Sequence, residues 1–155
     1  QILDFYYQQK QLERKKRLET AGQNLTEEQK KQLELVRQRS MEAGLIGNMY
    51  HIQTGLAIYF DRNQILPTSL EELYSDKFLA DKRIVENKNY LNYLYAYPQN
   101  RKTITYHLGI KLEADVENQP ALKKDADFNS ISAGYINGFD GTDPVYDVVV
   151  NNNWY

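Results

Sequence analysis

The chain contains no cysteine, and this absence removes three kinds of site at once. A disulfide framework, a thiolate zinc site and a cysteine nucleophile all require that residue. The cellular compartment stays open, because many exported bacterial proteins also lack cysteine.

Long apolar runs and catalytic motifs are also missing. No stretch approaches the ~20 residues that cross a bilayer, and no secretory signal peptide is visible. There is no phosphate-binding glycine loop, no H-E-x-x-H and no nucleophile elbow. The two histidines, His51 and His107, are isolated, which is typical of packing or surface residues. We therefore expect no catalytic residues and no enzyme activity.

The residues that are present suit one globular domain with a real core: 155 residues, 41% hydrophobic and 26% charged. The thirteen tyrosines favour half-buried strands. The net charge of −2 conceals a division along the chain. Residues 1–40 hold nine basic and six acidic side chains, whereas residues 113–155 hold two and eight. Such a division favours charge-complementary contact between copies of the chain or within one copy. The default interpretation is that these charges lie on solvated faces without a functional role.

Two helices are predicted in the first part of the chain. Residues 1–20 form a polar helix that ends at Gly22-Gln23-Asn24. Thr26 and Gln29 have the spacing of a capping box, so a second helix should begin near Thr26 and run to about Phe60. An antiparallel helical hairpin is slightly favoured over one long kinked rod.

The second helix becomes strongly amphipathic after residue 41. Gly44, Gly47 and Gly55 lie within it, and we expect them to let a sheet approach closely. Pro67 excludes further helix, and Thr68-Ser69 can cap a short helical turn. Its apolar stripe has helical spacing: Met41, Leu45, Met49, Ile52, Leu56 and Tyr59.

Period-two patterns follow and predict strands. The most secure hairpin joins residues 90–97 and 103–113 across the turn at 98–102. A short strand is predicted at 131–136, and a last one at 145–150. The prediction is an α+β fold: a long N-terminal helix, possibly preceded by a helical hairpin, on a sheet of three or four antiparallel strands. Residues 1–40 would form a charged helical extension, and residues 41–155 the globular domain.

Several segments carry a resemblance to a known family. The segment "I-Y-F-D-R-N-Q-I-L-P-T-S-L-E-E-L" (58–73) resembles the end of the long first helix of type IV pilins, and is closest to the major pseudopilins of type II secretion. The segments "Y-H-L-G-I-K-L-E" (106–113), "A-L-K-K-D-A-D-F" (121–128) and "G-F-D-G-T-D-P-V-Y-D-V" (138–148) resemble the sheet and C-terminal loop of the same subunits.

The resemblance implies a structural subunit of a pilus-like filament or pseudopilus at the bacterial cell surface, in the periplasm or outside the cell. Its partners would be other pilin-like subunits, with a membrane anchor supplied by an apolar helix upstream of Gln1. No nucleic acid partner is expected. The alternative is a cell-surface binding module that holds a ligand or partner on its tyrosine-rich sheet or acidic loop.

The resemblance also implies calcium in the loop before the last strand. Asp140, Asp143 and Asp147 place carboxylates within eight residues, and Asp125 and Asp127 could converge on the same place. Ordinary turn chemistry explains Asp-Gly and Asp-Pro equally well. A basic cluster at Lys10, Arg14, Lys15, Lys16 and Arg17 could contact phosphates or anionic lipid headgroups, with a solvated helix face as the default.

Overall fold

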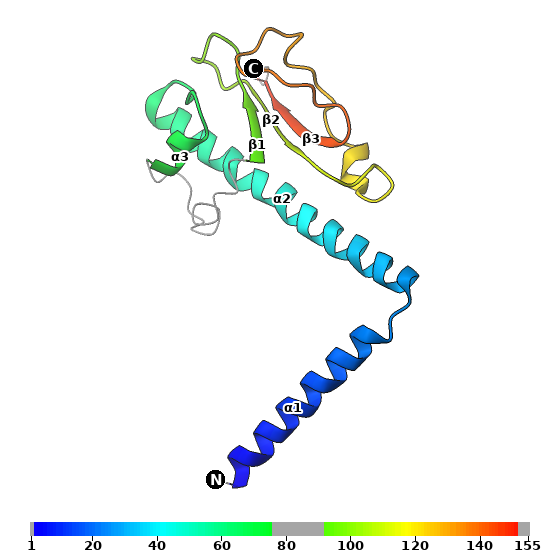
Figure 1. The fold of residues 1–155 in the computed structure, drawn as a ribbon. Helices are drawn as coiled ribbons and strands as arrows, with labels where there is room; N and C mark the ends of the chain where they lie inside the picture. Colours follow the sequence, from blue (N-terminus) through cyan, green and yellow to red (C-terminus); the bar gives the residue numbers. More distant parts are fainter. Residues whose placement is uncertain (1, 76–91, 152–155) are drawn as a thin grey trace. The chain divides into compact units, whose positions relative to one another are not determined.

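The computed structural model describes residues 2–75 and 92–151. It divides into two compact units, residues 1–37 and 38–155. The first unit holds helix α1 (Ile2–Gln23) and the start of helix α2 (Glu27–Asn63) (Figure 1). No helix in the described ranges is both long and apolar enough to cross a membrane.

The predicted capping box is confirmed at the start of α2. The Gln29 N–H donates to Thr26 Oγ1 at 3.1 Å, and the Thr26 N–H donates to Gln29 Oε1 at 3.0 Å. Each side chain thus satisfies a backbone donor that the first helical turn leaves unpaired. The break between the two predicted helices is also confirmed, at residues 24–26. The antiparallel arrangement of the two helices stays a prediction.

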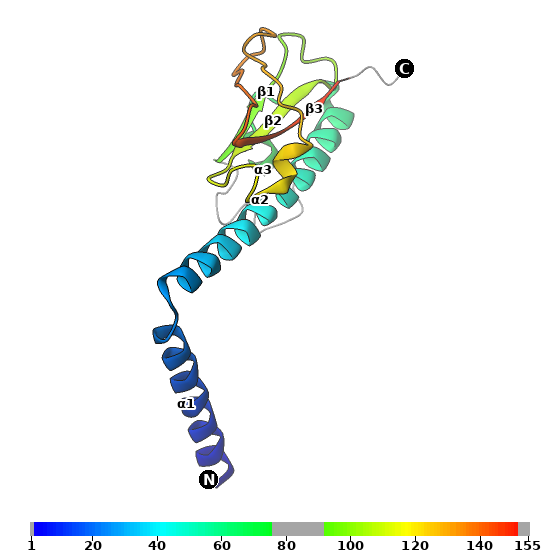
Figure 2. The same cartoon turned by 90° about the vertical axis from the view of Figure 1, so that its right-hand side faces the viewer.

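The second unit is an α+β layer, as predicted. Strands β1 (Tyr93–Ala96), β2 (Tyr106–Lys111) and β3 (Val145–Val150) form an antiparallel sheet in the order β1-β2-β3. Figures 1 and 2 show the sheet lying along the second half of α2. Helix α3 (Glu71–Ser75) and the 3-10 helix η2 (Pro120–Lys123) also lie in the described part of the chain.

The sheet has two differently covered faces, because neighbouring residues of a strand point to opposite sides. One face packs on α2 and forms the main core, with Leu56, Ile52 and Leu108 all at 0% exposure. Leu56 therefore faces the sheet, as its place in the apolar stripe predicted. The other face carries His107 and Asp147 and is covered by the segment that contains Phe139.

Helix α2 is also joined to the chain after β2 by a buried carboxylate. Glu42 is 2% exposed, and its Oε1 accepts the backbone N–H groups of Glu113 at 2.8 Å and Ala114 at 3.2 Å. Oε1 thus satisfies two backbone donors, whereas the buried Oε2 has no hydrogen-bond partner in the described chain. The contact joins the middle of α2 to the segment that follows strand β2.

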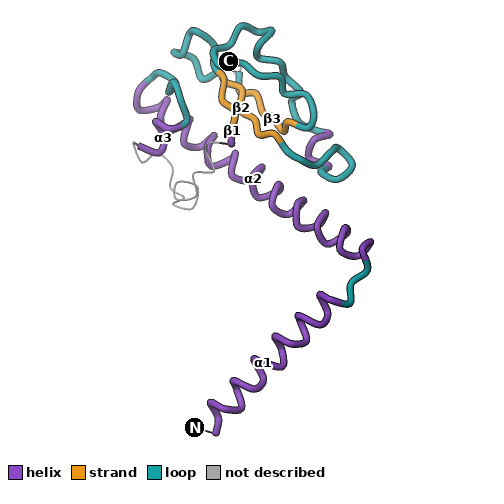
Figure 3. The backbone as a smooth tube through the Cα atoms, viewed as in Figure 1, coloured by secondary structure: helices purple, strands orange, loops and turns teal. Residues whose placement is uncertain are grey.

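Two predictions about the helix and the strands were wrong. Gly44 and Gly47 do not admit the sheet: a methyl group built on either would meet nothing within 4 Å, and only Gly55 is buried. Residues 131–136 form turns, with one isolated bridge between Ile136 and Tyr97. Figure 3 shows how much of the chain between β2 and β3 is loop. The predicted strand residues 90 and 91 lie outside the described part of the chain.

Candidate metal centre

Three of the five predicted aspartates come together in the second unit. Asp125, Asp127 and Asp147 each offer a carboxylate oxygen, and these oxygens lie within 4.8 Å of one another. Asp147 lies on β3, whereas the other two follow η2 on the preceding loop. The predicted convergence of these two segments is therefore confirmed for this trio.

The other two aspartates lie outside the trio. Asp140 accepts the Thr142 N–H at 3.0 Å, which is an ordinary Asx turn. Asp143 precedes a cis peptide bond to Pro144 and is exposed. It still interacts electrostatically with the cluster: partial desolvation of its carboxyl by neighbouring atoms, followed by the nearby Asp127 and Asp147 charges, raises its pKa.

Asp147 is the structural centre of the cluster. Its side chain is fully buried, Oδ1 accepts the Asp127 N–H at 2.9 Å, and Oδ2 accepts the Phe128 N–H at 2.9 Å. His107 Nε2 lies 2.7 Å from the same Oδ2. Burial opposes ionisation, but the His107 contact and the two backbone hydrogen bonds outweigh it and lower the pKa of Asp147. The carboxylate is thus held charged.

Asp125 has the opposite electrostatic character. Burial is the main cause that raises its pKa to about 6, and the carboxylates of Asp127, Asp147 and Asp143 add to the effect. Its Oδ2 accepts the Asp147 N–H at 3.3 Å, but its Oδ1 is buried without a hydrogen-bond partner. A buried oxygen without a partner among like charges is what a bound cation would satisfy.

The space around the trio is tight on one side. A methyl group on Gly141 would lie 2.2 Å from Asp147 Oδ2 and 2.7 Å from the Phe128 carbonyl oxygen. Only glycine therefore fits beside the carboxylate. The donor set consists of oxygens alone, which suits hard cations such as Ca²⁺ or Mg²⁺ rather than zinc or copper.

A buried hydrogen-bonded series that the sequence did not indicate supports this cluster. Ser130 Oγ lies 2.8 Å from His107 Nδ1, and His107 in turn contacts Asp147. All three side chains have 0% exposure. Ser130 Oγ also accepts the Phe139 N–H at 2.9 Å, and the His107 ring stacks on Phe139 at 3.8 Å between ring centroids.

The order serine–imidazole–carboxylate is also that of hydrolase triads. A nucleophile must reach its substrate, however, and this hydroxyl is enclosed by protein. We therefore interpret the Ser130–His107–Asp147 series as a structural link that joins the loops to strands β2 and β3. Sequence reasoning missed it because the three residues are separated by 17 to 40 positions.

The described tyrosines of the predicted β-hairpin are buried in the domain rather than exposed on its surface. Tyr93, Tyr95, Tyr97 and Tyr106 are 7%, 8%, 4% and 3% exposed, and they belong to the core against α2. The Tyr95 hydroxyl donates to the Pro67 carbonyl at 2.9 Å. These tyrosines are therefore packing residues, and the hydroxyls of Tyr93 and Tyr95 donate to backbone carbonyls.

Comparison with known proteins does not add a family to this description. No protein-family model, curated protein or solved structure matches the chain. Its function must therefore be argued from its own residues.

Proposed function

We propose that the chain is a structural subunit of a pilin-like filament, of the type IV pilus or type II secretion pseudopilus kind, that assembles through its helix. The α+β layer, with a long helix under a three-stranded antiparallel sheet, supports this proposal. In this view the protein works outside the cytoplasm, and its partners are further pilin-like subunits.

The observation that carries the proposal is a bare seam on helix α2. Going along the helix, every third or fourth residue lies on the side opposite the buried face, and all of these residues are exposed. The spacing of alternating fours and threes is that of helices that pack side by side. We call this surface the α2 seam: Ser40, Gly44, Gly47, His51, Thr54 and Ile58.

The seam is costly for an isolated chain. Glycine within a helix is ~1 kcal/mol less favourable than alanine, and Gly44 and Gly47 have free space where a side chain could stand. No contact inside the described chain explains two glycines at these positions. Their absent side chains would allow the backbone of another helix to approach closely, which is how small residues act at helix interfaces.

A cation at Asp125, Asp127 and Asp147 would complete the subunit. Calcium fits the all-oxygen donor set, and it would give the unpartnered Asp125 Oδ1 a partner. It would tie the loop after η2 to strand β3, so its role would be to stabilise the head of the subunit rather than to take part in a reaction.

Self-association tests the proposal. The isolated chain should be mainly monomeric and should associate weakly as its concentration rises, as followed by sedimentation velocity. The double variant Gly44→Leu/Gly47→Leu should abolish this association while the helix becomes more stable, because each leucine removes a helix glycine and meets no neighbour.

Gly22→Leu is the matched control. Gly22 lies in α1 and also has nothing within 4 Å, so the substitution should strengthen a helix and leave association unchanged. Association that is absent in the parent chain, or unaffected by the seam leucines, would contradict the filament proposal. A stable high-order oligomer in about 0.5 M salt, where charge contacts are screened, would place assembly elsewhere in the chain.

Thermal unfolding tests the cation separately. A cation that binds only the folded chain adds about 2.7 kcal/mol of stability at a hundredfold excess over its Kd. The Tm should rise with calcium and fall with chelator, and Asp125→Asn should lose this response. Asp140→Asn is the control, since Asp140 lies outside the trio. If calcium did not change the Tm, the three aspartates would be ordinary loop and strand residues. The proposal that the α2 seam mediates assembly would be unaffected.

A further inference from the structure

Helix α1 exposes an unusual set of apolar side chains. Its first two turns carry five of them, with Ile2 88% and Leu3 71% exposed. An exposed apolar cluster of this size on one helix is unfavourable in water. The others are Phe5, Tyr6 and Tyr7, at 64%, 53% and 64%.

Cations follow directly on the same side of the helix. Leu3, Tyr6 and Tyr7 are continued at spacings of three and four by Lys10, Arg14 and Arg17. We call these six residues the aromatic–basic face. The acidic residues Asp4 and Glu19 lie on the other side of the helix, and Glu13 lies at the edge of the face.

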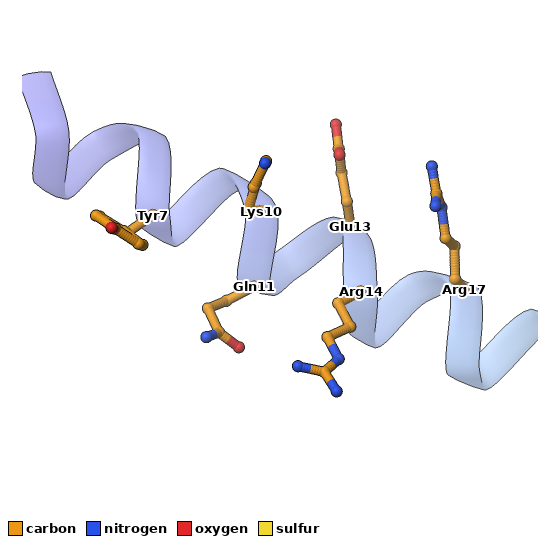
Figure 4. A pocket seen from close by; sticks show the side chains of 6 residues that line it. All are labelled: Tyr7, Lys10, Gln11, Glu13, Arg14 and Arg17. Atoms are coloured by element: carbon orange, nitrogen blue, oxygen red, sulfur yellow. The ribbon is translucent and has the colours of Figure 1, made fainter.

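Four side chains of this face, together with Gln11 and Glu13, line a shallow groove. Figure 4 shows Tyr7, Gln11 and Arg14 along one edge of this groove and Lys10, Glu13 and Arg17 along the other edge. Lys10 Nζ lies 5.1 Å from the centre of the Tyr6 ring, so the aromatic and basic parts adjoin. Polarity therefore changes along the helix axis, from apolar at residues 2–7 to basic at residues 10–17.

We propose that α1 binds the surface of an anionic phospholipid bilayer through the aromatic–basic face. Leucine and tyrosine side chains of the first turns enter the headgroup–acyl boundary, where tyrosine rings are favoured. Lys10, Arg14 and Arg17 extend their long side chains to the lipid phosphates. The charge of the cluster is complementary to such a surface.

A bilayer explains the helix better than a nucleic acid does. Phosphates of either partner would attract the cations, and bases could stack on tyrosines. A nucleic acid, however, offers no place for the exposed aliphatic side chains of Ile2 and Leu3. The proposal concerns a different surface from the α2 seam and stands without the filament proposal.

Vesicle co-sedimentation of the full chain tests the inference. Binding should be seen with vesicles of phosphatidylcholine containing about one quarter phosphatidylglycerol, should weaken with salt, and should be far weaker with phosphatidylcholine alone. Arg14→Gln/Arg17→Gln should weaken binding about 30-fold, since each surface cation contributes about fivefold. Leu3→Ser/Tyr7→Ser should weaken it by about tenfold or more.

Lys15→Gln/Lys16→Gln is the matched control, because it removes the same charge from the same helix away from the face. It should weaken binding by less than about fivefold, and circular dichroism should show unchanged helicity in every variant. Equal losses for the two charge pairs, equal binding to neutral vesicles, or binding to an oligonucleotide without binding to vesicles would each overturn the proposal. Gly44→Leu/Gly47→Leu should leave vesicle binding intact, which separates this inference from the filament proposal.

Discussion

Helix α1 and the second half of helix α2 differ in what holds them. In α1, Leu12 and Leu18 are 50% and 67% exposed, whereas Ile52 and Leu56 of α2 are both at 0%. A helix without packing partners is only marginally stable in water and depends on the helix propensity and capping of its own residues. A packed helix gains most of its stability from its buried face. The comparison teaches that two helices of one chain can be read by the same sequence rules and still have different physical support.

The largest expected effect contrasts the two histidines. His107→Leu should lower the free energy of unfolding by ~3–5 kcal/mol, because it leaves the buried Asp147 carboxylate without its imidazole partner. His51→Leu, on the exposed seam, should change it by less than ~0.5 kcal/mol. Chemical denaturation measures both. A small effect at His107 would mean that the backbone donors alone are enough to support Asp147.

A second contrast uses matched leucines. Leu56→Ala should cost ~2–5 kcal/mol as a truncation in the core, whereas Leu12→Ala should stay within ~0.5 kcal/mol. Denaturant midpoints at constant slope are the measurement. Should both variants lose the same stability, α1 would have to be packed in solution, and the difference between the helices would disappear.

The smallest expected effect is the response of the core tyrosines to alkaline pH. Burial raises the pKa of Tyr93 and of Tyr106 to about 12, from a model-compound value of 10. Their contribution to stability is complete below pH 10 and is lost as the pH rises through about 12, because only the unfolded chain ionises them readily. Denaturation at stepped pH should show this decline.

Tyr93→Phe should reduce the alkaline decline. This variant also removes the hydroxyl that donates to the Leu45 carbonyl at 2.5 Å, so it will be somewhat less stable at neutral pH. The slope of stability against pH, rather than its level, is therefore the quantity to compare. An unchanged slope would contradict the burial of Tyr93, because it would show that the hydroxyl ionises as readily in the folded chain as in the unfolded chain.

Much of the fold could be predicted because its signals are local. The Thr26–Gln29 capping box lies within four residues, and the helix start follows from it. Strand β3 was predicted with its observed bounds, Val145–Val150, from a short run of β-branched residues. The prediction of a strand at 131–136 was wrong, because a strand also needs a partner that is distant in sequence. In the structure this segment meets such a partner only at the isolated bridge between Ile136 and Tyr97.

The glycines show how the same sequence signal permits two structures. Gly44, Gly47 and Gly55 lie in the same helix, and the expectation placed all three near the sheet. The buried face of the helix contains Met49 and Leu56, and Gly55 is buried beside them. Gly44 and Gly47 have no neighbouring atoms within 4 Å of an added methyl group. The apolar stripe through Ile52 and Leu56 does indicate which side the sheet covers. The expectation for Gly44 and Gly47 was wrong because these glycines lie on the other side of the helix.

The amino-acid sequence by itself determined helices α1 and α2, the break between them, the β1–β2 hairpin and the acidic character of the C-terminal part. Each of these features depends on neighbours along the chain. Only the tertiary structure decided that Asp147 meets Asp125 and Asp127 rather than Asp140 and Asp143. The reason is physical: antiparallel pairing of β2 with β3 places Asp147 opposite Gly109, next to His107, and the loop after η2 closes over it through two backbone N–H groups.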